Sequence, residues 1–527
     1  MIITVLDYGA GNVRSLINAV EKMGGQVKMV ETPEDILAAE KLIFPGVGNY
    51  ASMIKILHEK NFVEPLREYL KADRPFLGIC VGMQALFEGS EEELVPKESL
   101  GFFKGRVERF KTDLSVPHIG WNGINIKQDS PLLAGVEPDT KFYFVHSYHI
   151  VPQDPSVILA TTTYDYEYAS AVQQGNVMGT QFHPEKSGAA GMQLLENFIQ
   201  SHNLRAGGPV DIPARGLSKR VIACLDVRSN DNGDLVVTKG DQYDVREEGS
   251  VRNLGKPVSL AGKYYEQGAD EITFLNITGF RDFPLEDMPM LRVLEETSKN
   301  VFVPLTIGGG IREFTDADGK HYTALDVAAR YFRSGADKIS IGSDAVYVAE
   351  AFIESGEKTG KSAIEQISLV YGAQAVVISV DPRRAWVASP EDAPKHHVIA
   401  SKEKGPNGEA YCWYQCTVRG GREARDIDAV ALAKACQALG AGEILLNCID
   451  RDGTNSGFDL DLVNAVRKSV SIPVIASSGA GCAAHFSEVF QNTDAEAALA
   501  AGIFHREEVP IQAVKKHLAD QGIEVRQ

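Results

Sequence analysis

Short apolar runs alternate with helical patterns over about the first 203 residues of the chain. The runs IITVLDYGAGN, KLIFPGVGNY, RPFLGIC and NVMGTQFHPE each read as a buried strand that ends in a turn rich in glycine or proline. This alternation predicts an α/β domain over residues 1–203, with functional groups where the strands end.

A second and more regular alternation occupies residues 218–527. Its eight strand candidates are RVIACLDV, DEITFLNIT, VFVPLTIGGG, DKISIGSD, QAVVISVDP, EILLNCID, IPVIASSG and EAALAAGIF. Eight strands separated by helical stretches predict a (β/α)8 TIM barrel. The intervening residues 204–217 contain three Gly and two Pro, which predicts a short linker.

The second alternation also repeats internally. GADEITFLNI, which begins at Gly268, returns as GAGEILLNCI at Gly440, and VPLTIGGG returns as IPVIASSG. We interpret the two halves as copies of one half-barrel. Residues 241–256 and 383–425 are predicted as polar loop insertions, the first of them a mobile lid.

Composition narrows the class of protein. Hydrophobic residues make up 44% and charged residues 24%, as in globular proteins, while the net charge of −18 argues against a nucleic-acid-binding surface. No apolar run reaches the ~18 residues of a membrane span, and MIITVLDYGAGN reads as a strand, not as a signal peptide. Seven cysteines, an odd number, indicate reduced thiols.

The stretch RPFLGICVGMQ predicts a nucleophile elbow. Its apolar run ends at Cys80, between Gly78 and Gly82, and a helix-like segment follows at once. Such a turn exposes the thiol at a helix N-terminus, where the thiolate is favoured. A buried cysteine between two loop glycines is the alternative.

A general base for this thiol follows a later strand at His183. Pro184 ends that strand, and Glu185 stands where its carboxylate can orient the imidazole. A histidine at a strand end can also be purely structural. The turn at Gly46, Val47 and Gly48 offers backbone N–H groups for an oxyanion hole, although an ordinary strand-to-helix turn has the same pattern.

GxCxGxQ followed by HPE resembles the class I glutamine amidotransferases over residues 1–203. The resemblance implies that Cys80 attacks the side-chain amide of L-glutamine, releases ammonia and forms a thioester that water hydrolyses. His183 would move the protons and Glu185 would orient it. Residues matching positions near the glutamine pocket are Gln84, His146, Ser147 and Tyr148.

Two aspartates end equivalent strands of the two half-barrels, Asp226 in CLDV and Asp381 in SVDP. Carboxylates on opposite sides of a barrel mouth can act as general acid and base, or each can simply cap its loop. One glycine-rich turn per half suggests a substrate with a phosphate at each end. These turns are Gly308, Gly309 and Gly310, and Ser477, Ser478 and Gly479; further mouth candidates are Lys239, Asp450, Asp452 and Gly453.

This half resembles the cyclase of the imidazole glycerol phosphate synthases, through CLDV, VVTKG, FLNIT, GGGI, GADK, SVDP, GAGEILL, IDRDGT and ASSGAG. The resemblance implies a bisphosphorylated ribonucleotide substrate, phosphoribulosyl-formimino-aminoimidazole carboxamide ribotide (PRFAR). Ammonia would convert it into imidazole glycerol phosphate and aminoimidazole carboxamide ribotide, a step of histidine biosynthesis. Ser478 departs from the family, where a second glycine is common.

Four charged residues, Arg220, Glu271, Lys338 and Glu443, each stand just before a barrel strand. Two cations and two anions can close a ring at the barrel bottom, which either stabilises the barrel or, by resemblance, gates an ammonia tunnel. On the second interpretation the Cys80 face docks against the barrel bottom, with Asn12, Tyr143 and Lys186 near the seam.

The prediction is therefore a bifunctional enzyme, glutaminase plus cyclase-lyase. A glutaminase feeding another phosphosugar barrel, and a catalytically silent glutamine- or nucleotide-sensing scaffold, are the alternatives. No metal or organic cofactor and no macromolecular partner is expected, and a monomer can carry both activities. The expected compartment is the cytoplasm, or the plastid stroma if a transit peptide has been removed.

Overall fold

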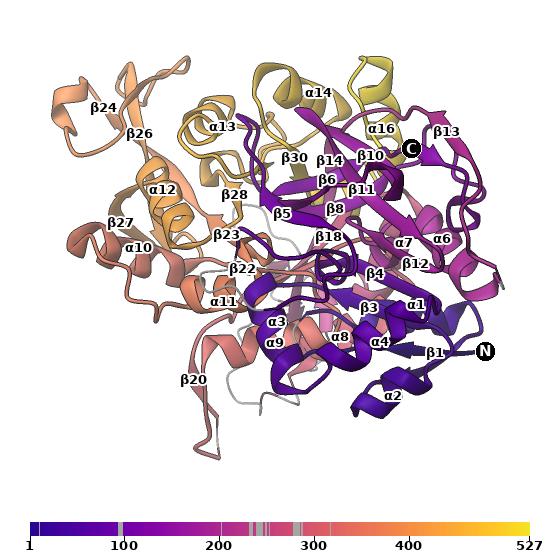
Figure 1. Ribbon diagram of the computed structural model, residues 1–527. Coiled ribbons are helices and arrows are strands. Elements are labelled where there is room, and N and C mark those ends of the chain that lie inside the picture. The colour runs from indigo at the N-terminus through magenta and orange to yellow at the C-terminus, as the bar shows by residue number, and fades with distance from the viewer. Residues whose placement is uncertain are drawn as a thin grey trace.

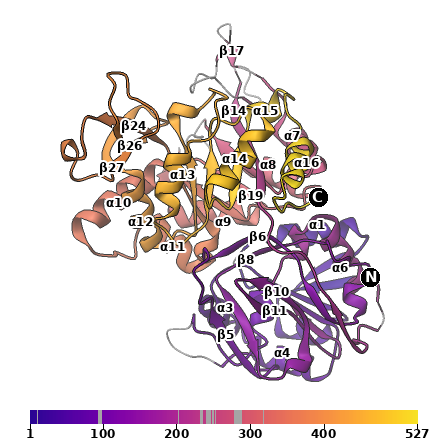
Figure 2. The ribbon, with the colours of Figure 1, turned by 90° about the horizontal axis from the view of Figure 1, so that it is seen from above.

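The computed structural model describes residues 1–9, 11–92, 98–201, 203–230, 235–238, 246–247, 250–251, 253–277, 285, 288–316 and 318–527. Within them the chain forms two parts that lie against each other, an N-terminal α/β domain and a barrel (Figures 1 and 2). Both predicted folds are confirmed, and β6 and β8 of the first domain lie at the seam (Figure 2).

The N-terminal domain is built on a sheet in the order β13-β7-β10-β11-β12-β4-β3-β1-β2, with β5 and β9 attached. Strands β12, β4, β3, β1 and β2 are parallel neighbours, so their carboxyl ends share one edge. The strands are β1 Ile2–Val5, β2 Gln26–Met29, β3 Leu42–Gly46, β4 Phe76–Cys80, β5 Gly105–Arg109, β6 His118–Asn122, β7 Asn125–Gln128, β8 Phe142–His146, β9 Tyr148–Pro152, β10 Ile158–Tyr164, β11 Tyr166–Gln174, β12 Val177–Thr180 and β13 Pro209–Ile212. The helices are α1 Arg14–Lys22, α2 Pro33–Ala38, α3 Tyr50–Glu59, α4 Val63–Lys71, α5 Val81–Gln84 and α6 Gly188–Gln200.

Eight parallel strands close the barrel in the order β14-β18-β19-β22-β23-β28-β29-β30, and β30 pairs with β14. Their bounds are β14 Arg220–Ser229, β18 Glu271–Asn276, β19 Leu305–Gly308, β22 Lys338–Ile341, β23 Val376–Val380, β28 Glu443–Asn447, β29 Val474–Ser477 and β30 Ala497–Ala500. The helices are α7 Pro257–Glu266, α8 Pro289–Ser298, α9 Ala324–Arg333, α10 Ser343–Ser355, α11 Ala363–Tyr371, α12 Ala429–Leu439, α13 Leu460–Arg467, α14 Ala483–Asn492, α15 Gly502–His505 and α16 Ile511–Asp520. Short two-stranded pairs are β14 with β15 Leu235–Val237, β16 Arg246–Glu247 with β17 Ser250–Val251, and β20 Phe314–Thr315 with β21 His321–Tyr322.

Local sequence explains these boundaries. The barrel strands are short runs rich in Val, Ile and Leu that are buried throughout, as expected where helices cover a parallel sheet. Helices α9 and α11 begin at capping boxes, Thr323 with Asp326 and Ser362 with Glu365, which satisfy the first backbone N–H groups.

Two segments depart from the predicted loops. The insertion after strand β23 folds into a four-stranded antiparallel sheet that projects from the barrel (Figure 1): β24 Pro382–Val387, β25 Ile399–Ala400, β26 Tyr411–Val418 and β27 Glu423–Asp428. The sequence predicts a polar loop here because charged residues, Gly and Pro separate its short strands. Cys412 and Cys416 of β26 are buried. Within the predicted linker, β13 pairs with β7.

The two parts meet through specific polar contacts. Asn12 donates to the carbonyl oxygen of Gly335 (2.9 Å) and to Asp337 (2.8 Å), and Lys186 pairs with Asp337 at 2.6 Å. Trp121 Nε1 donates to the carbonyl oxygen of Asp270 at 3.0 Å. Because Asp270 and Asp337 precede Glu271 and Lys338, the N-terminal domain docks on the bottom of the barrel, as predicted from the sequence.

Candidate active sites

The Cys80 thiol stands at a sharp turn between β4 and α5. Cys80 has φ +52° and ψ −109°, a backbone conformation that residues with a side chain rarely adopt. A Cβ on Gly82 would lie 1.9 Å from the carbonyl oxygen of Phe44, and one on Gly78 would lie 2.6 Å from that of Gly82. The turn therefore requires both glycines. The helix after it is shorter than expected, since α5 ends at Gln84.

His183 and Glu185 form a buried pair beside this thiol. His183 Nδ1 and Glu185 Oε1 are 2.8 Å apart. Burial alone would lower the pKa of His183, but the Glu185 carboxylate and the Cys80 sulfur outweigh it and raise the pKa to about 10. The Glu185 carboxylate therefore favours the protonated form of His183 beside the sulfur.

A chain of side-chain amides supports the thiol. Gln181 Nε2 donates to Cys80 Sγ at 3.4 Å, and Gln84 Nε2 donates both to Gln181 Oε1 and to the carbonyl oxygen of Tyr148, each at 3.1 Å. Gln84, a candidate for glutamine binding, therefore orders Gln181 and Tyr148. Gln181 was not among the predicted site residues.

The HSY segment lies next to this chain. His146 Nδ1 is 2.7 Å from the carbonyl oxygen of Tyr148, and its Nε2 is 3.2 Å from the hydroxyl of Tyr168. Burial lowers the pKa of His146 to about 3, so the ring is neutral. Ser147 accepts from Phe110 N–H through its carbonyl oxygen. These contacts make His146 a buried support of the pocket wall.

The glycine turn after β3 contacts the barrel. The Tyr8 hydroxyl donates to the carbonyl oxygen of Val47 at 2.6 Å. Gly48 has φ +138°, and a Cβ there would lie 2.9 Å from the carbonyl oxygen of Val370, the next-to-last residue of α11. Gly46, the last residue of β3, packs on Gly82. The candidate oxyanion turn is therefore fixed between the nucleophile elbow and a barrel helix.

The two aspartates belong to opposite strands of the barrel. Asp381 directly follows β23, as predicted, but the prediction that Asp226 ends its strand is wrong: β14 continues to Ser229, and Asp226 pairs with Leu275 near the carboxyl end of β18. Asn447 Nδ2 donates to Asp381 Oδ1 at 3.0 Å, and Thr417 Oγ1 donates to the carbonyl oxygen of Asp381 at 2.7 Å. Burial raises the pKa of Asp381; Asn447 lowers it, and the negative charge of Asp452 raises it. Asp226 is half-buried and lies beside Cys224 (Sγ to Oδ1 3.9 Å).

The second glycine-rich turn borders a small hollow that opens at the mouth. Five candidate residues are among its walls, namely Asp452, Gly453, Ser477, Ser478 and Gly479. Ser478 has φ +72°, a conformation in which glycine is favoured. In the first turn, a Cβ on Gly309 would lie 2.2 Å from the carbonyl oxygen of Asn276, so the backbone is closely packed. Lys239 lies outside the described residues.

The four charged residues at the barrel bottom form a closed buried ring. Arg220 lies 3.0 Å from Glu271 and 2.5 Å from Glu443, and Lys338 lies 2.7 and 2.6 Å from the same carboxylates. All four side chains are at most 1% exposed. Tyr143 of the N-terminal domain lies close to this ring. Burial and the negative charge of Glu271 raise the pKa of Tyr143, and the positive charge of Arg220 lowers it, so that the pKa is raised overall.

Comparison with known proteins decides the family. Residues 4–201 match the family model described as glutamine amidotransferase class-I. Residues 220–510 match a second family model, which is described as histidine biosynthesis protein. The chain is 60% identical over 532 residues to imidazole glycerol phosphate synthase hisHF, chloroplastic, of Arabidopsis thaliana (all of this chain, 89% of the relative). It is 56% identical over 542 residues to the hisHF protein of Schizosaccharomyces pombe (all of both chains). The chain belongs to the fused imidazole glycerol phosphate synthases.

The barrel alone resembles separate subunits. The HisF subunit of Methanosphaera stadtmanae is 42% identical over 310 residues, which is 59% of this chain and 99% of that subunit. A fused synthase therefore joins in one polypeptide a glutamine amidotransferase and a cyclase, and the chain is a bifunctional enzyme of histidine biosynthesis.

The fused synthase has a site residue that sequence patterns did not indicate. Glu92 accepts from the backbone N–H of Tyr50 at 2.8 Å and is close enough to Tyr148 and Tyr8 to raise their pKa values. Burial raises the pKa of Glu92 to about 7. In the sequence it belongs to the acidic run EEE, which has the appearance of a solvated surface.

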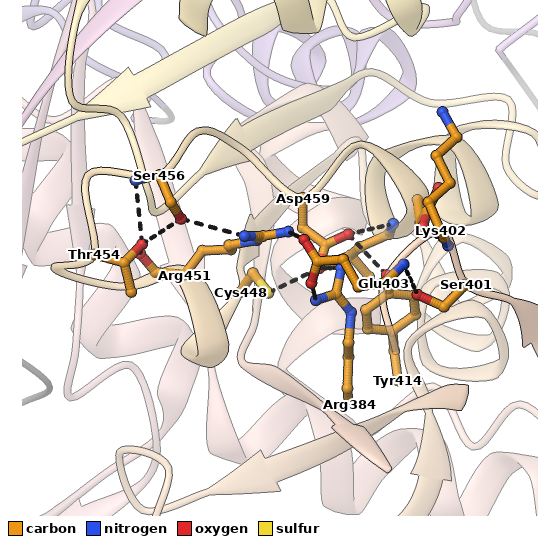
Figure 3. A network of polar contacts seen from close by, with 12 residues as sticks. Arg384, Ser401, Lys402, Glu403, Tyr414, Cys448, Arg451, Thr454, Ser456 and Asp459 are labelled. Atoms are coloured by element: carbon orange, nitrogen blue, oxygen red, sulfur yellow. Dashed lines mark hydrogen bonds and ion pairs between the residues drawn. The ribbon is translucent and has the colours of Figure 1, made fainter. Parts of the chain in front are cut away.

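A polar network ties the inserted sheet to the loop after β28 (Figure 3). Arg384 pairs with Asp459 (2.7 Å) and Glu403 (2.5 Å), and its backbone N–H donates to Asp450 at 2.6 Å. Arg451 also binds Glu403. Asp450, a predicted mouth residue, is therefore held by the insertion.

Among the described residues, none of the helices has the length and apolar character needed to cross a membrane. The same residues hold no group of three or more His, Cys, Asp or Glu side chains arranged to bind a metal ion.

Proposed function

We propose that Cys80 hydrolyses L-glutamine through a thioester. The thiolate attacks the side-chain amide carbon, the C–N bond breaks, and the nitrogen leaves as ammonia with a proton from His183. Water then hydrolyses the thioester to glutamate, and His183 takes up a proton again. The observation that carries the proposal is the buried contact between His183 Nδ1 and Glu185 Oε1 (2.8 Å), which orients the imidazole ring beside the Cys80 sulfur.

Glu92 is proposed to bind the α-amino group of glutamine. A carboxylate that is partly removed from water gains most from a cationic partner, and Glu92 lies by Tyr148 on the same side of the pocket. The turn Gly46–Gly48 is proposed to supply the oxyanion hole. The Val47–Gly48 peptide unit would have to turn, since the Val47 carbonyl now points to the Tyr8 hydroxyl.

Ammonia is proposed to travel through the ring into the barrel. The backbone N–H of His183 donates to the carbonyl oxygen of Tyr143 (2.9 Å), so the segments that carry the glutaminase base and the Tyr143 phenol at the ring are in direct contact. Above the ring the barrel interior is an apolar cluster: Ile222, Cys224, Val377, Leu445, Ile475, Ala497, Leu499 and Ala501. An apolar enclosed path keeps ammonia unprotonated, because it excludes the water that would supply protons.

At the mouth, ammonia is proposed to add to PRFAR, whose phosphates bind at Gly308–Gly310 and Ser477–Gly479. Cyclisation and cleavage then give imidazole glycerol phosphate and aminoimidazole carboxamide ribotide. The raised pKa of Asp381 favours its protonated form, so we assign it the general-acid role and Asp226 the general-base role.

We further propose that the chain acts as a monomer in the cytoplasm. The plastid stroma is the alternative, because the Arabidopsis thaliana relative is named chloroplastic. Sedimentation or light scattering of the purified chain tests the monomer, and microscopy of the tagged full-length protein in its own cells tests the compartment.

The test of the activity is glutamate release and PRFAR consumption by the purified chain, with and without the other substrate. We expect both products, and faster glutamate release when PRFAR is present. A chain that binds glutamine and PRFAR but converts neither would instead be the sensing scaffold.

A further inference from the structure

A cationic side chain, Arg506, lines the hollow at the barrel mouth, and it is not among the site residues predicted from the sequence. Arg506, just after α15, lines it together with Ser478, Gly479 and Gly502. We propose that Arg506 is a phosphate ligand of the cyclase and sets the affinity for one of the two phosphates of the substrate. This inference rests on the proposed function, because it takes the hollow to be a phosphate site.

The guanidinium lies over the start of α15. A Cβ on Gly502 would be 2.8 Å from Arg506 Nη1 and 3.4 Å from its Cζ, so the planar group lies against the first residue of the helix. The backbone around Gly502 also lines the hollow. The planar guanidinium thereby stands at the wall of the hollow, where its fork of donors suits a phosphate with several acceptor oxygens.

The neighbouring arginine is committed elsewhere. Arg451 precedes Asp452, a wall residue, and its Cβ packs behind Gly479. Its guanidinium, however, binds Glu403 of the inserted sheet and Ser456 (Figure 3). Among the described residues that line the hollow, Arg506 is the one with a cationic side chain. It is therefore the group that can offset the carboxylate of Asp452 when a dianion enters.

Glu508 pairs with Arg506, and a phosphate can take the place of Glu508 in this pair. Arg506 Nε and Nη2 donate to the two carboxylate oxygens of Glu508, at 2.7 and 3.0 Å. Both side chains are partly exposed, at 37% and 45%, and exposed ion pairs contribute little stability. A phosphate dianion is a stronger acceptor for the planar fork than one carboxylate, so ligand binding can replace Glu508.

The experiment measures ammonia-dependent cyclisation of PRFAR by the full chain, with ammonium salts as the nitrogen source. We expect Arg506→Gln to raise KM by about 10- to 100-fold, the loss typical of a charge-assisted hydrogen bond, with kcat within about twofold. Arg506→Lys keeps the charge without the fork and should fall between wild type and Arg506→Gln. Arg419→Gln, which removes an exposed arginine paired with Glu423, is the matched control and should leave KM unchanged.

A second readout separates phosphate binding from distortion of the mouth. Each product carries one phosphate, so competitive inhibition by imidazole glycerol phosphate and by aminoimidazole carboxamide ribotide reports on the two ends independently. Arg506→Gln should weaken inhibition by one product and spare the other. An unchanged KM, or equal weakening of both products, overturns the proposal. A wild-type chain that never consumes PRFAR would instead overturn the proposed function.

Discussion

The two catalytic regions of this synthase differ in how far they are assembled before a substrate arrives. Around Cys80 the catalytic groups are buried and already in contact, with Glu185 2.8 Å from His183 and Gln181 on the sulfur. At the barrel mouth Asp226 lies in β14 and Asp381 follows β23, and neither lines the hollow at the second glycine-rich turn. Covalent catalysis needs an activated nucleophile that is already in contact with its base, whereas groups that act on opposite ends of a substrate can stand apart.

The difference extends to the charged groups. The ring at the barrel bottom is closed: each cation lies between two carboxylates, and all four side chains are buried. The mouth instead has Arg506 in a replaceable pair with Glu508. Removing one member of a buried, fully paired ring costs about 3–5 kcal/mol, whereas an exposed pair contributes ~0–1 kcal/mol. Breaking the ring is therefore expected to cost far more stability than breaking the pair of Arg506 and Glu508.

The largest expected effect separates the two regions completely. Cys80→Ala removes the nucleophile, so glutamine-dependent formation of imidazole glycerol phosphate should fall to background. Cyclisation with ammonium salts should continue at the wild-type rate, because the mouth is untouched. Product formation with each nitrogen source, measured on the same preparation, checks this. Loss of both activities would show that the mouth depends on an intact Cys80 site.

The reciprocal change is the next largest. Asp381→Asn should lower ammonia-dependent kcat by about 10²- to 10⁴-fold, the usual contribution of a general acid or base. Basal glutamate release should stay within about twofold, and the thermal midpoint should not fall, since the substitution nearly preserves shape. A parallel collapse of glutamate release would mean that the two regions are not independently assembled.

The sequence indicates those parts of the two sites that lie where an apolar run ends. Cys80 is the last residue of β4 and Asp381 directly follows β23, so an abrupt strand end in the sequence indicates both. His183 follows the end of β12 by three residues, and Asp226 lies inside β14, three residues before its end. The fold followed for the same reason, as eight buried runs alternate with helices. At Cys80 and Asp381 the local sequence therefore indicates both the end of a strand and a side chain suited to catalysis.

The remaining features depend on contacts between distant segments. Glu92 lies in an acidic run and Arg506 in HREE, both typical of solvated surface. Only tertiary packing buries Glu92 and brings Arg506 to the wall of the hollow. The strands of the inserted sheet pair with one another, and charged residues, Gly and Pro separate them, so the segment reads as a polar loop. Long buried runs such as the barrel strands are easier to detect.

A smaller effect tests the glutamine pocket through pH. Burial raises the pKa of Glu92 to about 7, so below that pH the group is increasingly protonated and cannot pair with an ammonium. kcat/KM for glutamine should fall roughly tenfold per pH unit below pH 7, as expected when one ionised group is required. A second decline is expected near pH 10, where His183 loses its proton. Glu92→Gln should flatten the acid limb and keep the alkaline one; an unchanged acid limb would remove Glu92 from glutamine binding.

The smallest effect concerns the mouth. The hydrogen bond from Asn447 lowers the pKa of Asp381, so Asn447→Ala should raise that pKa further. If Asp381 acts as the acid, the alkaline decline of ammonia-dependent kcat should move to higher pH by up to about one unit, equivalent to ~1.4 kcal/mol. The profile of kcat against pH measures this shift. A shift of the acid limb to higher pH, with the alkaline limb unchanged, would instead assign the base role to Asp381.

The central claim is that ammonia passes from Cys80 to the mouth inside the chain. The most direct measurement supplies wild-type protein with glutamine labelled with ¹⁵N in its side-chain amide, PRFAR and an excess of unlabelled ammonium. Mass spectrometry then gives the label in imidazole glycerol phosphate. We predict that nearly all product molecules carry ¹⁵N whatever the ammonium concentration. Label diluted in proportion to the external ammonium would show that ammonia leaves the protein first, and would contradict this account.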